Sequence, residues 1–192
     1  MKIIGLMGKA GAGKTTISDY LCFKYGYYSR NFSAPIKEML SQLPGMEDIT
    51  IWEQRDRKER ELYLFQKSPR YFAQTLGTEW GRQLIHEDIW IKCMEVHLWT
   101  ARYEYFVIPD VRFQNEADWI RRKDGILVTV ARNVDYAVRP HSSEVLDVNF
   151  PNEKHFRIYN DKTVADLYFA ANELHGFALR YWEQRQQQQV VE

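Results

Sequence analysis

A glycine-rich stretch near the N-terminus constrains the fold of this 192-residue chain more than any other feature. It reads Gly8-Lys9-Ala10-Gly11-Ala12-Gly13-Lys14-Thr15-Thr16 and has the spacing Gly-x-x-x-x-Gly-Lys-Thr. The apolar run 3–7 precedes it, and apolar residues recur after it at helical spacing, which predicts a strand, a loop and a helix. In such a loop the backbone N–H groups and the helix N-terminus point at a polyphosphate. The stretch therefore predicts a phosphate-binding loop, and the alternative is a turn that merely joins a strand to a helix.

Individual residues of this loop have expected roles in binding ATP. Lys14 is expected to reach the β- and γ-phosphates, and the Thr15 hydroxyl to bind Mg²⁺. The remaining ATP-binding positions are those whose backbone lines the loop and the first helical turn, namely Gly11, Ala12, Gly13 and Thr16.

Composition limits the partners of the chain. With 45% hydrophobic and 27% charged residues, 192 residues suffice for one α/β domain with insertions. The formal net charge is zero, so we expect small ligands and neither a nucleic-acid polymer nor a membrane as a partner. No signal sequence or long apolar segment is evident, and we expect a soluble, cytoplasmic protein.

Apolar runs alternate with helical patterns along the chain. Strands are expected near 28–32, 105–108, 126–131 and 156–159, which predicts a three-layer α/β fold with a parallel sheet flanked by helices. Asp110 follows the second of these runs, where a carboxylate can serve as the second anchor for magnesium.

The region 34–100 is predicted to be helical. Ser33 resembles an N-cap with Pro35 in the first turn, which puts Lys37 near a helix start. The charged run 53–61 predicts a solvated helix. Ser68-Pro69 opens another helix, on which four-residue spacing allows one face to carry Arg70, Gln74 and Thr78. A further helix from Asp88 to about Thr100 is expected to turn Ile89, Cys93 and Val96 inward.

The segment 132–151 has no periodicity, which is typical of a lid, and it contains Arg132 and Arg139. Its His-Ser-Ser-Glu group lacks the Gly-x-Ser-x-Gly sequence of α/β-hydrolases, which argues against hydrolysis. Asn160-Asp161 is expected to cap a last helix with an inward face of Val164, Leu167, Tyr168, Ala171, Leu174, Ala178 and Tyr181, and the tail 184–192 to fray.

Three classes of phosphate-loop protein can be compared with these features. A GTPase needs Asn-Lys-x-Asp, which Asn160-Asp161-Lys162 does not supply, and a nucleic-acid-dependent ATPase needs a basic stripe. A small-molecule kinase needs a second anion-binding pocket and mobile arginines. The residues that can provide them are Lys37, Arg70, Arg132 and Arg139.

Several blocks, taken in order, resemble the bacteriophage-type deoxynucleoside monophosphate kinases. These blocks are the phosphate loop, Ala34-Pro35-Ile36-Lys37, Gln74-Thr75-Leu76-Gly77-Thr78, Trp90, Pro109-Asp110-Val111-Arg112, Asn115-Glu116, Val130-Ala131-Arg132 and Asn160-Asp161. The resemblance implies a single kinase domain over 1–192, with a monophosphate-binding helical segment at 34–100 and a lid at 132–151. It also implies the reaction ATP + dNMP → ADP + dNDP, with Mg²⁺, and a location in the host cytoplasm if a phage encodes the chain.

The resemblance and the chemistry together assign the candidate site. Lys14, Arg132 and Arg139 are the candidate catalytic residues, and Thr15 and Asp110 the candidate metal ligands. The candidate acceptor-binding residues are Lys9, Ala34, Pro35, Lys37, Arg70, Gln74, Thr78, Trp90 and Arg112.

Two alternatives stay open at this point, namely another small-molecule kinase of the same fold and an ATP-binding regulatory module without turnover. The sequence also leaves open the base preference, the selectivity for deoxyribose over ribose, and whether the chain forms a homodimer.

Overall fold

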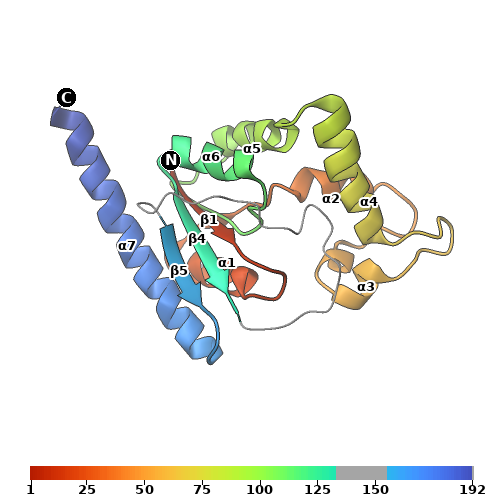
Figure 1. Ribbon diagram of the computed structural model, residues 1–192, viewed down its shortest axis with the longest axis horizontal. Helices are drawn as coiled ribbons and strands as arrows, with labels where there is room; N and C mark the ends of the chain where they lie inside the picture. The colour runs from red at the N-terminus through yellow and green to blue at the C-terminus, as the bar shows by residue number, and fades with distance from the viewer. Residues whose placement is uncertain (133–154, 192) are drawn as a thin grey trace. The chain divides into compact units, whose positions relative to one another are not determined.

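The computed structural model describes residues 1–132 and 155–191, and within them the chain forms two compact units. The first unit combines residues 1–31 with the described residues from 101 onward, and the second comprises residues 32–100. Figure 1 labels the elements of both units. The expected lid segment 132–151 lies outside the described residues except for Arg132.

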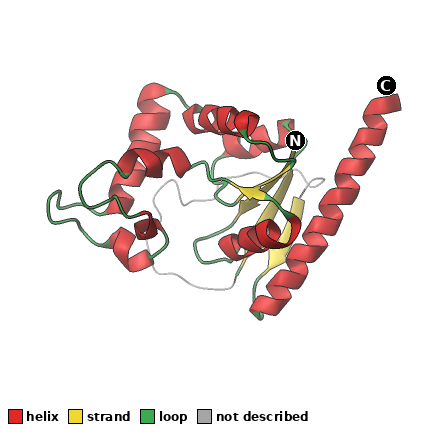
Figure 2. Ribbon diagram, turned by 180° about the vertical axis from the view of Figure 1, so that it is seen from behind, coloured by secondary structure: helices red, strands yellow, loops and turns green. Residues whose placement is uncertain are grey.

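The first unit is built on a parallel five-stranded sheet. Its strands are β1 (Lys2–Met7), β2 (Tyr28–Ser29), β3 (Tyr105–Ile108), β4 (Ile126–Ala131) and β5 (His155–Tyr159). Their order across the sheet is β2-β3-β1-β4-β5, so β1 lies in the centre with β3 and β4 as neighbours. Figure 2 shows the same strands in yellow from the opposite side. The sheet confirms the prediction of a parallel α/β fold.

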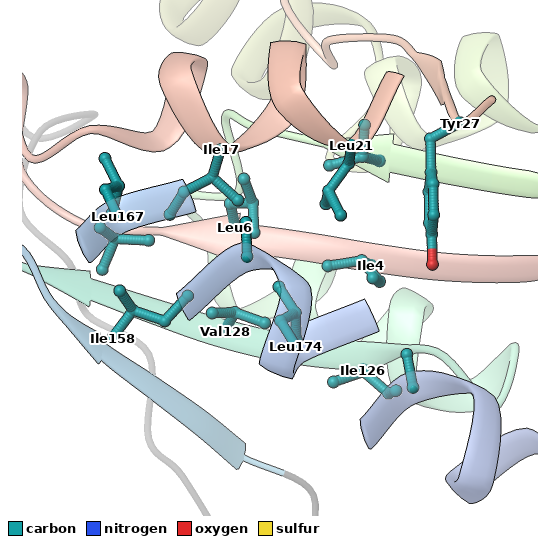
Figure 3. Close-up of a cluster of buried hydrophobic side chains, with 14 of the residues drawn as sticks. Ile4, Leu6, Ile17, Leu21, Tyr27, Ile126, Val128, Ile158, Leu167 and Leu174 are labelled. Carbon is teal, nitrogen blue, oxygen red and sulfur yellow. The ribbon is translucent and has the colours of Figure 1, made fainter. Parts of the chain in front are cut away.

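Helices cover both faces of this sheet. Alternate residues of β1 and β4, among them Ile4, Leu6 and Val128, join a buried cluster with α1 (Lys14–Tyr25) and α7 (Val164–Val191). Figure 3 shows this cluster between the two helices and the strands. On the other face, the space beside Gly5 is filled by Ile120 of α6 (Gln114–Arg122) and by Leu127. The expected three layers are therefore present.

Helix α7 begins later in the chain than the cap predicted at Asn160-Asp161. The Thr163 hydroxyl accepts from the Asp166 N–H at 3.3 Å, and the Asp166 carboxylate accepts from the Thr163 N–H at 3.1 Å. These reciprocal bonds form a capping box, so Thr163 caps the helix in place of Asn160-Asp161. The buried face is Leu167, Ala171, Leu174, Ala178 and Trp182, whereas Val164 and Tyr168 are exposed. The helix includes the glutamine-rich segment and continues to Val191.

The second unit is helical. It contains α2 (Ala34–Leu40), the short 3₁₀ turn η1 (Ile49–Trp52), α3 (Arg55–Glu59), α4 (Pro69–Thr75), the π-helical stretch η2 (Leu76–Ile85) and α5 (Ile89–Thr100). Ser68 caps α4 as predicted, because its side chain accepts from the Tyr71 N–H. Ser33 is the N-cap residue of α2 with Pro35 in the first turn, as predicted, although the Ser33 side chain makes no capping hydrogen bond.

Two glycines allow side chains of α2 and α5 to pack closely against η2. A Cβ atom on Gly81 would lie 2.5 Å from Cζ2 of Trp90, and one on Gly77 would lie 2.9 Å from Cδ1 of Ile36. The Trp90 indole N–H also donates to the Gly77 carbonyl at 2.7 Å. A side chain that bonds a backbone carbonyl competes with the regular helical ladder, which accounts for the change from α to π winding.

The inward face of α5 also differs from the expected one. Its buried residues are Trp90, Ile91, Met94 and Leu98, while Val96 is 66% exposed. The expected inward face began at Ile89, one residue before the first residue of the observed buried face. Within the described residues, no helix is long and apolar enough to cross a membrane.

Candidate active site

The phosphate-binding loop lies at the carboxyl end of β1, in the centre of the sheet. Gly8 and Gly13 have φ values of +145° and +104°, which strongly favour glycine. Gly13 is the N-cap residue of α1, and the Ile17 N–H donates to its carbonyl at 3.1 Å, which starts the helix. The loop and the helix N-terminus therefore have the arrangement that binds a polyphosphate.

The Lys14 side chain folds over this loop. Its Nζ donates to the carbonyl oxygens of Gly8 at 2.6 Å and of Lys9 at 2.9 Å. The pKa of Lys14 is lowered from 10.5 to about 8, mainly by burial and also by the positive charge of Arg112, while the carboxylate of Asp110 opposes both effects. The loop thus holds a largely desolvated cation, which an anionic ligand would stabilise.

The segment after β3 brings Asp110 and Arg112 to the same edge of the sheet. The Val111 N–H donates to the Leu6 carbonyl at 3.3 Å, which joins this segment to β1. The carboxylate of Glu116, which is 2% exposed, accepts from the backbone N–H groups of Arg112 at 2.7 Å and Phe113 at 3.1 Å. Glu116 therefore holds the Asp110–Arg112 segment in place beside the loop.

The second unit carries most of the residues expected to hold the acceptor, namely Ala34, Pro35, Lys37, Arg70, Gln74, Thr78 and Trp90. Arg70 and Gln74 lie one turn apart on α4, and Thr78 follows on η2. All three are half-buried.

Two of these residues have partners that the sequence did not indicate. Arg70 forms an ion pair with Glu59 of α3, so part of the charged run 53–61 faces another element of its unit. In the same run, Arg57 pairs with Asp48 at 2.7 Å. Trp90 is 2% exposed and bonds to Gly77, so it supports η2 from within the unit and is not available to a ligand in this structure.

The remaining candidates lie at the surface or outside the described residues. Lys9 and Thr15 are exposed and Thr16 is half-buried, while Gly11 and Ala12 complete the loop. Arg132 follows β4 and is exposed, and Arg139 lies outside the described residues.

Comparisons with known proteins identify the family. Residues 50–170 match the family model described as deoxynucleotide monophosphate kinase. A putative deoxynucleotide monophosphate kinase of Acanthamoeba polyphaga mimivirus is 31% identical over 182 residues, which cover 88% of this chain and 93% of that protein. The chain belongs to the deoxynucleotide monophosphate kinase family.

Two further matches are narrower. The deoxynucleoside-5′-monophosphate kinase of Escherichia phage T5 is 41% identical over 80 residues, which cover 39% of this chain and 32% of that protein. A gluconokinase from Sinorhizobium meliloti 1021 has a TM-score of 0.50 at 13% identity and covers 95% of this chain and 97% of its own, which shows similarity of fold alone.

The donor set of this family member fits a magnesium ion that is bound mainly through a nucleotide. Among the described residues, no group of three or more His, Cys, Asp or Glu side chains could hold a metal ion. Mg²⁺ in kinases keeps waters and uses one or two protein ligands together with substrate phosphates. One hydroxyl, Thr15, and one carboxylate, Asp110, at the loop end of the sheet match that requirement.

Proposed function

We propose that this member of the deoxynucleotide monophosphate kinase family transfers the γ-phosphoryl group of ATP to the phosphate of a deoxynucleoside monophosphate. A phosphate oxygen of the acceptor forms a bond to the γ-phosphorus, and the bond from that phosphorus to the β,γ-bridging oxygen breaks, which gives dNDP and ADP. The observation that carries the proposal is the desolvated Lys14, held over a phosphate-binding loop in a chain of this family.

The reaction requires positioning and charge neutralisation more than proton transfer. The acceptor phosphate is largely dianionic near neutral pH, because its second pKa is about 6, so no general base is needed. Two anions must then approach in line, and preorganised cations and N–H groups lower the barrier. Lys14 and the loop N–H groups provide such groups on the ATP side.

The charged and polar residues of the candidate site divide between the metal and the acceptor. We assign Thr15 and Asp110 as the protein ligands of Mg²⁺, which neutralises phosphate charge when it is bound. Arg112 lies within electrostatic reach of Lys14, and we assign it to the acceptor together with Lys9. Lys37 and Arg70 hold the acceptor phosphate, and Gln74 and Thr78 contact its sugar or base.

Exchange of partners at Arg70 follows from this assignment. Glu59 forms an ion pair with Arg70, so a bound acceptor phosphate would take the place of the Glu59 carboxylate on the guanidinium. Arginine binds carboxylate and phosphate with the same planar pairs of N–H groups, so this exchange needs no new geometry at Arg70. Arg132 and Arg139 contact the transferring phosphoryl group in the reacting state.

A transfer assay over a panel of acceptors tests the proposal. Labelled ATP is incubated with dGMP, dTMP, dCMP, dAMP, GMP and non-nucleotide acceptors, with and without Mg²⁺. We expect labelled dNDP from at least one dNMP, dependent on the metal. Transfer to a non-nucleotide acceptor alone would indicate another kinase of this fold, and nucleotide binding without any transfer would indicate a regulatory module.

A further inference from the structure

The side chain of Asn160 reaches from the end of β5 to the phosphate-binding loop. Its Nδ2 donates to the Ala12 carbonyl at 2.9 Å. Its backbone N–H donates to the Ala131 carbonyl at 2.8 Å, one residue beyond the pairing of Ala131 with Tyr159. The sheet therefore fixes the Asn160 backbone, and the side chain leaves it from a defined position.

Packing at Gly13 shows how closely Asn160 contacts the loop. A Cβ atom on Gly13 would lie 2.6 Å from Nδ2 of Asn160 and 3.0 Å from Cδ2 of Leu167. The neighbouring Ala12 is 2% exposed, so little water reaches this part of the loop. A buried carbonyl needs a hydrogen-bond partner, and Asn160 provides one for Ala12.

The Ala12 carbonyl and the Gly13 N–H belong to one peptide unit. In a planar trans peptide these two groups point in opposite directions, so a bond that fixes the carbonyl also fixes the N–H. The Gly13 N–H is among the donors that a phosphate-binding loop directs at the polyphosphate. Asn160 thus determines the orientation of a phosphate donor without reaching the phosphate itself.

We propose that Asn160 is a positioning residue for ATP, acting through the Ala12–Gly13 peptide. This inference rests on the proposed function, because it assumes that the loop binds the phosphates of ATP. It also assigns a role to the Asn160-Asp161 block, which the sequence analysis treated as a helix cap. The expected effect falls on the nucleotide donor, because Asn160 acts through the Gly13 N–H, which is directed at the phosphates of ATP.

Two variants of Asn160 and one matched control test the inference. Asn160→Ala removes the side-chain donor, and Asn160→Asp keeps the shape but places a carboxylate oxygen against the Ala12 carbonyl. The control is Asn172→Ala on α7, because Oδ1 of Asn172 accepts from the side chains of Tyr20, Lys24 and Tyr25 and has no contact with the loop. ADP binding is measured by calorimetry, KM values for ATP and dNMP by steady-state kinetics, and Tm by thermal unfolding.

We expect both Asn160 variants to weaken ADP binding and to raise the KM for ATP by about tenfold, the upper range for one lost hydrogen bond, with Asn160→Asp the more affected. The KM for dNMP at saturating ATP stays unchanged, and Asn172→Ala lowers Tm but binds ADP as the wild type does. Wild-type ADP affinity in Asn160→Asp overturns the inference, as does a fall in Tm with no change in the KM for ATP.

A wild type that binds no ADP overturns both this inference and the proposed function, whereas tight binding by wild type and Asn160 variants alike overturns the inference alone.

Discussion

Replacing Lys14 by methionine should separate the stability of this protein from its activity. Methionine has a similar length and no charge, so Lys14→Met removes the ammonium while leaving most of the packing. The pKa of Lys14 is lowered from 10.5 to about 8, which corresponds to about 3 kcal/mol opposing the charged form in the folded protein. At pH 7, below this pKa, the lysine is charged and the folded state bears that cost in full.

The hydrogen bonds of Lys14 offset this cost. Its bonds to the carbonyls of Gly8 and Lys9 are lost in Lys14→Met, and each contributes about 1.5 kcal/mol, the lower value for a charged donor. The two effects nearly cancel, so the free energy of unfolding of Lys14→Met should lie within about 1 kcal/mol of that of the wild type. Phosphate transfer should fall at least about 10³-fold, because a cation that stabilises the transferring phosphates is gone.

The assays are urea unfolding at pH 7 and transfer of labelled phosphate. The matched control is Lys24→Met, because Lys24 lies on the same helix and bonds to Tyr20 and Asn172, away from the loop. This control should lose a little stability and keep its activity. A clear loss of stability in Lys14→Met would refute the reasoning about its burial, and a near-normal kcat would refute its role in transfer.

Three further predictions concern the acceptor side and the core. Arg70→Ala should raise the KM of every dNMP about tenfold or more, whereas Glu59→Gln, which breaks the same ion pair, should not raise it. An equal increase of KM in both variants would mean that the ion pair, and not a contact of Arg70 with the acceptor, determines the KM. Trp90→Phe should lower the free energy of unfolding by about 1–3 kcal/mol, because the buried Gly77 carbonyl loses its indole partner, with no change in the KM for dNMP; an altered KM would place the indole at the ligand. Burial and the nearby Lys24 lower the pKa of His175, so Tm should fall as the pH drops below about 6.5, and the His175→Phe variant should show a smaller fall.

The fold was predictable in segments where the apolar residues fit only one periodicity, that of a strand or that of a helix. The strands around the phosphate-binding loop are short apolar runs followed by polar or glycine residues, and their carboxyl ends must meet at one edge of a parallel sheet. That rule places Asp110 beside Lys14, and the structure confirms that the two lie within electrostatic reach of each other.

Errors arose where several faces of a helix fit the pattern. Helix α5 is apolar on more than one face, so the sequence permitted a face starting at Ile89, whereas the structure buries one that includes Trp90 and Met94. The π winding of η2 involves the bond from the Trp90 indole to the Gly77 carbonyl, 13 residues apart in the chain. Propensity and periodicity describe single elements and contain no information on such a contact.

Periodicity did not predict the roles of two supporting residues of the site, Asn160 and Glu116. Asn160 bonds to Ala12 over 148 positions, and the buried Glu116 carboxylate bonds to backbone N–H groups that any sequence could supply. The sequence contains one signal for the first of these contacts. Asn160 follows a strand of the same parallel sheet, at the edge where the loop lies.

Separate measurement of ADP and dNDP in one reaction is the most direct test of phosphate transfer between the two nucleotides. The wild type is incubated with ATP, Mg²⁺ and the preferred dNMP, and both products are quantified by chromatography over the time course. We expect equal amounts of ADP and dNDP, with ADP formation near zero when dNMP is omitted. ADP formed without an equal amount of dNDP, or at the same rate without the acceptor, would contradict phosphate transfer to a deoxynucleoside monophosphate.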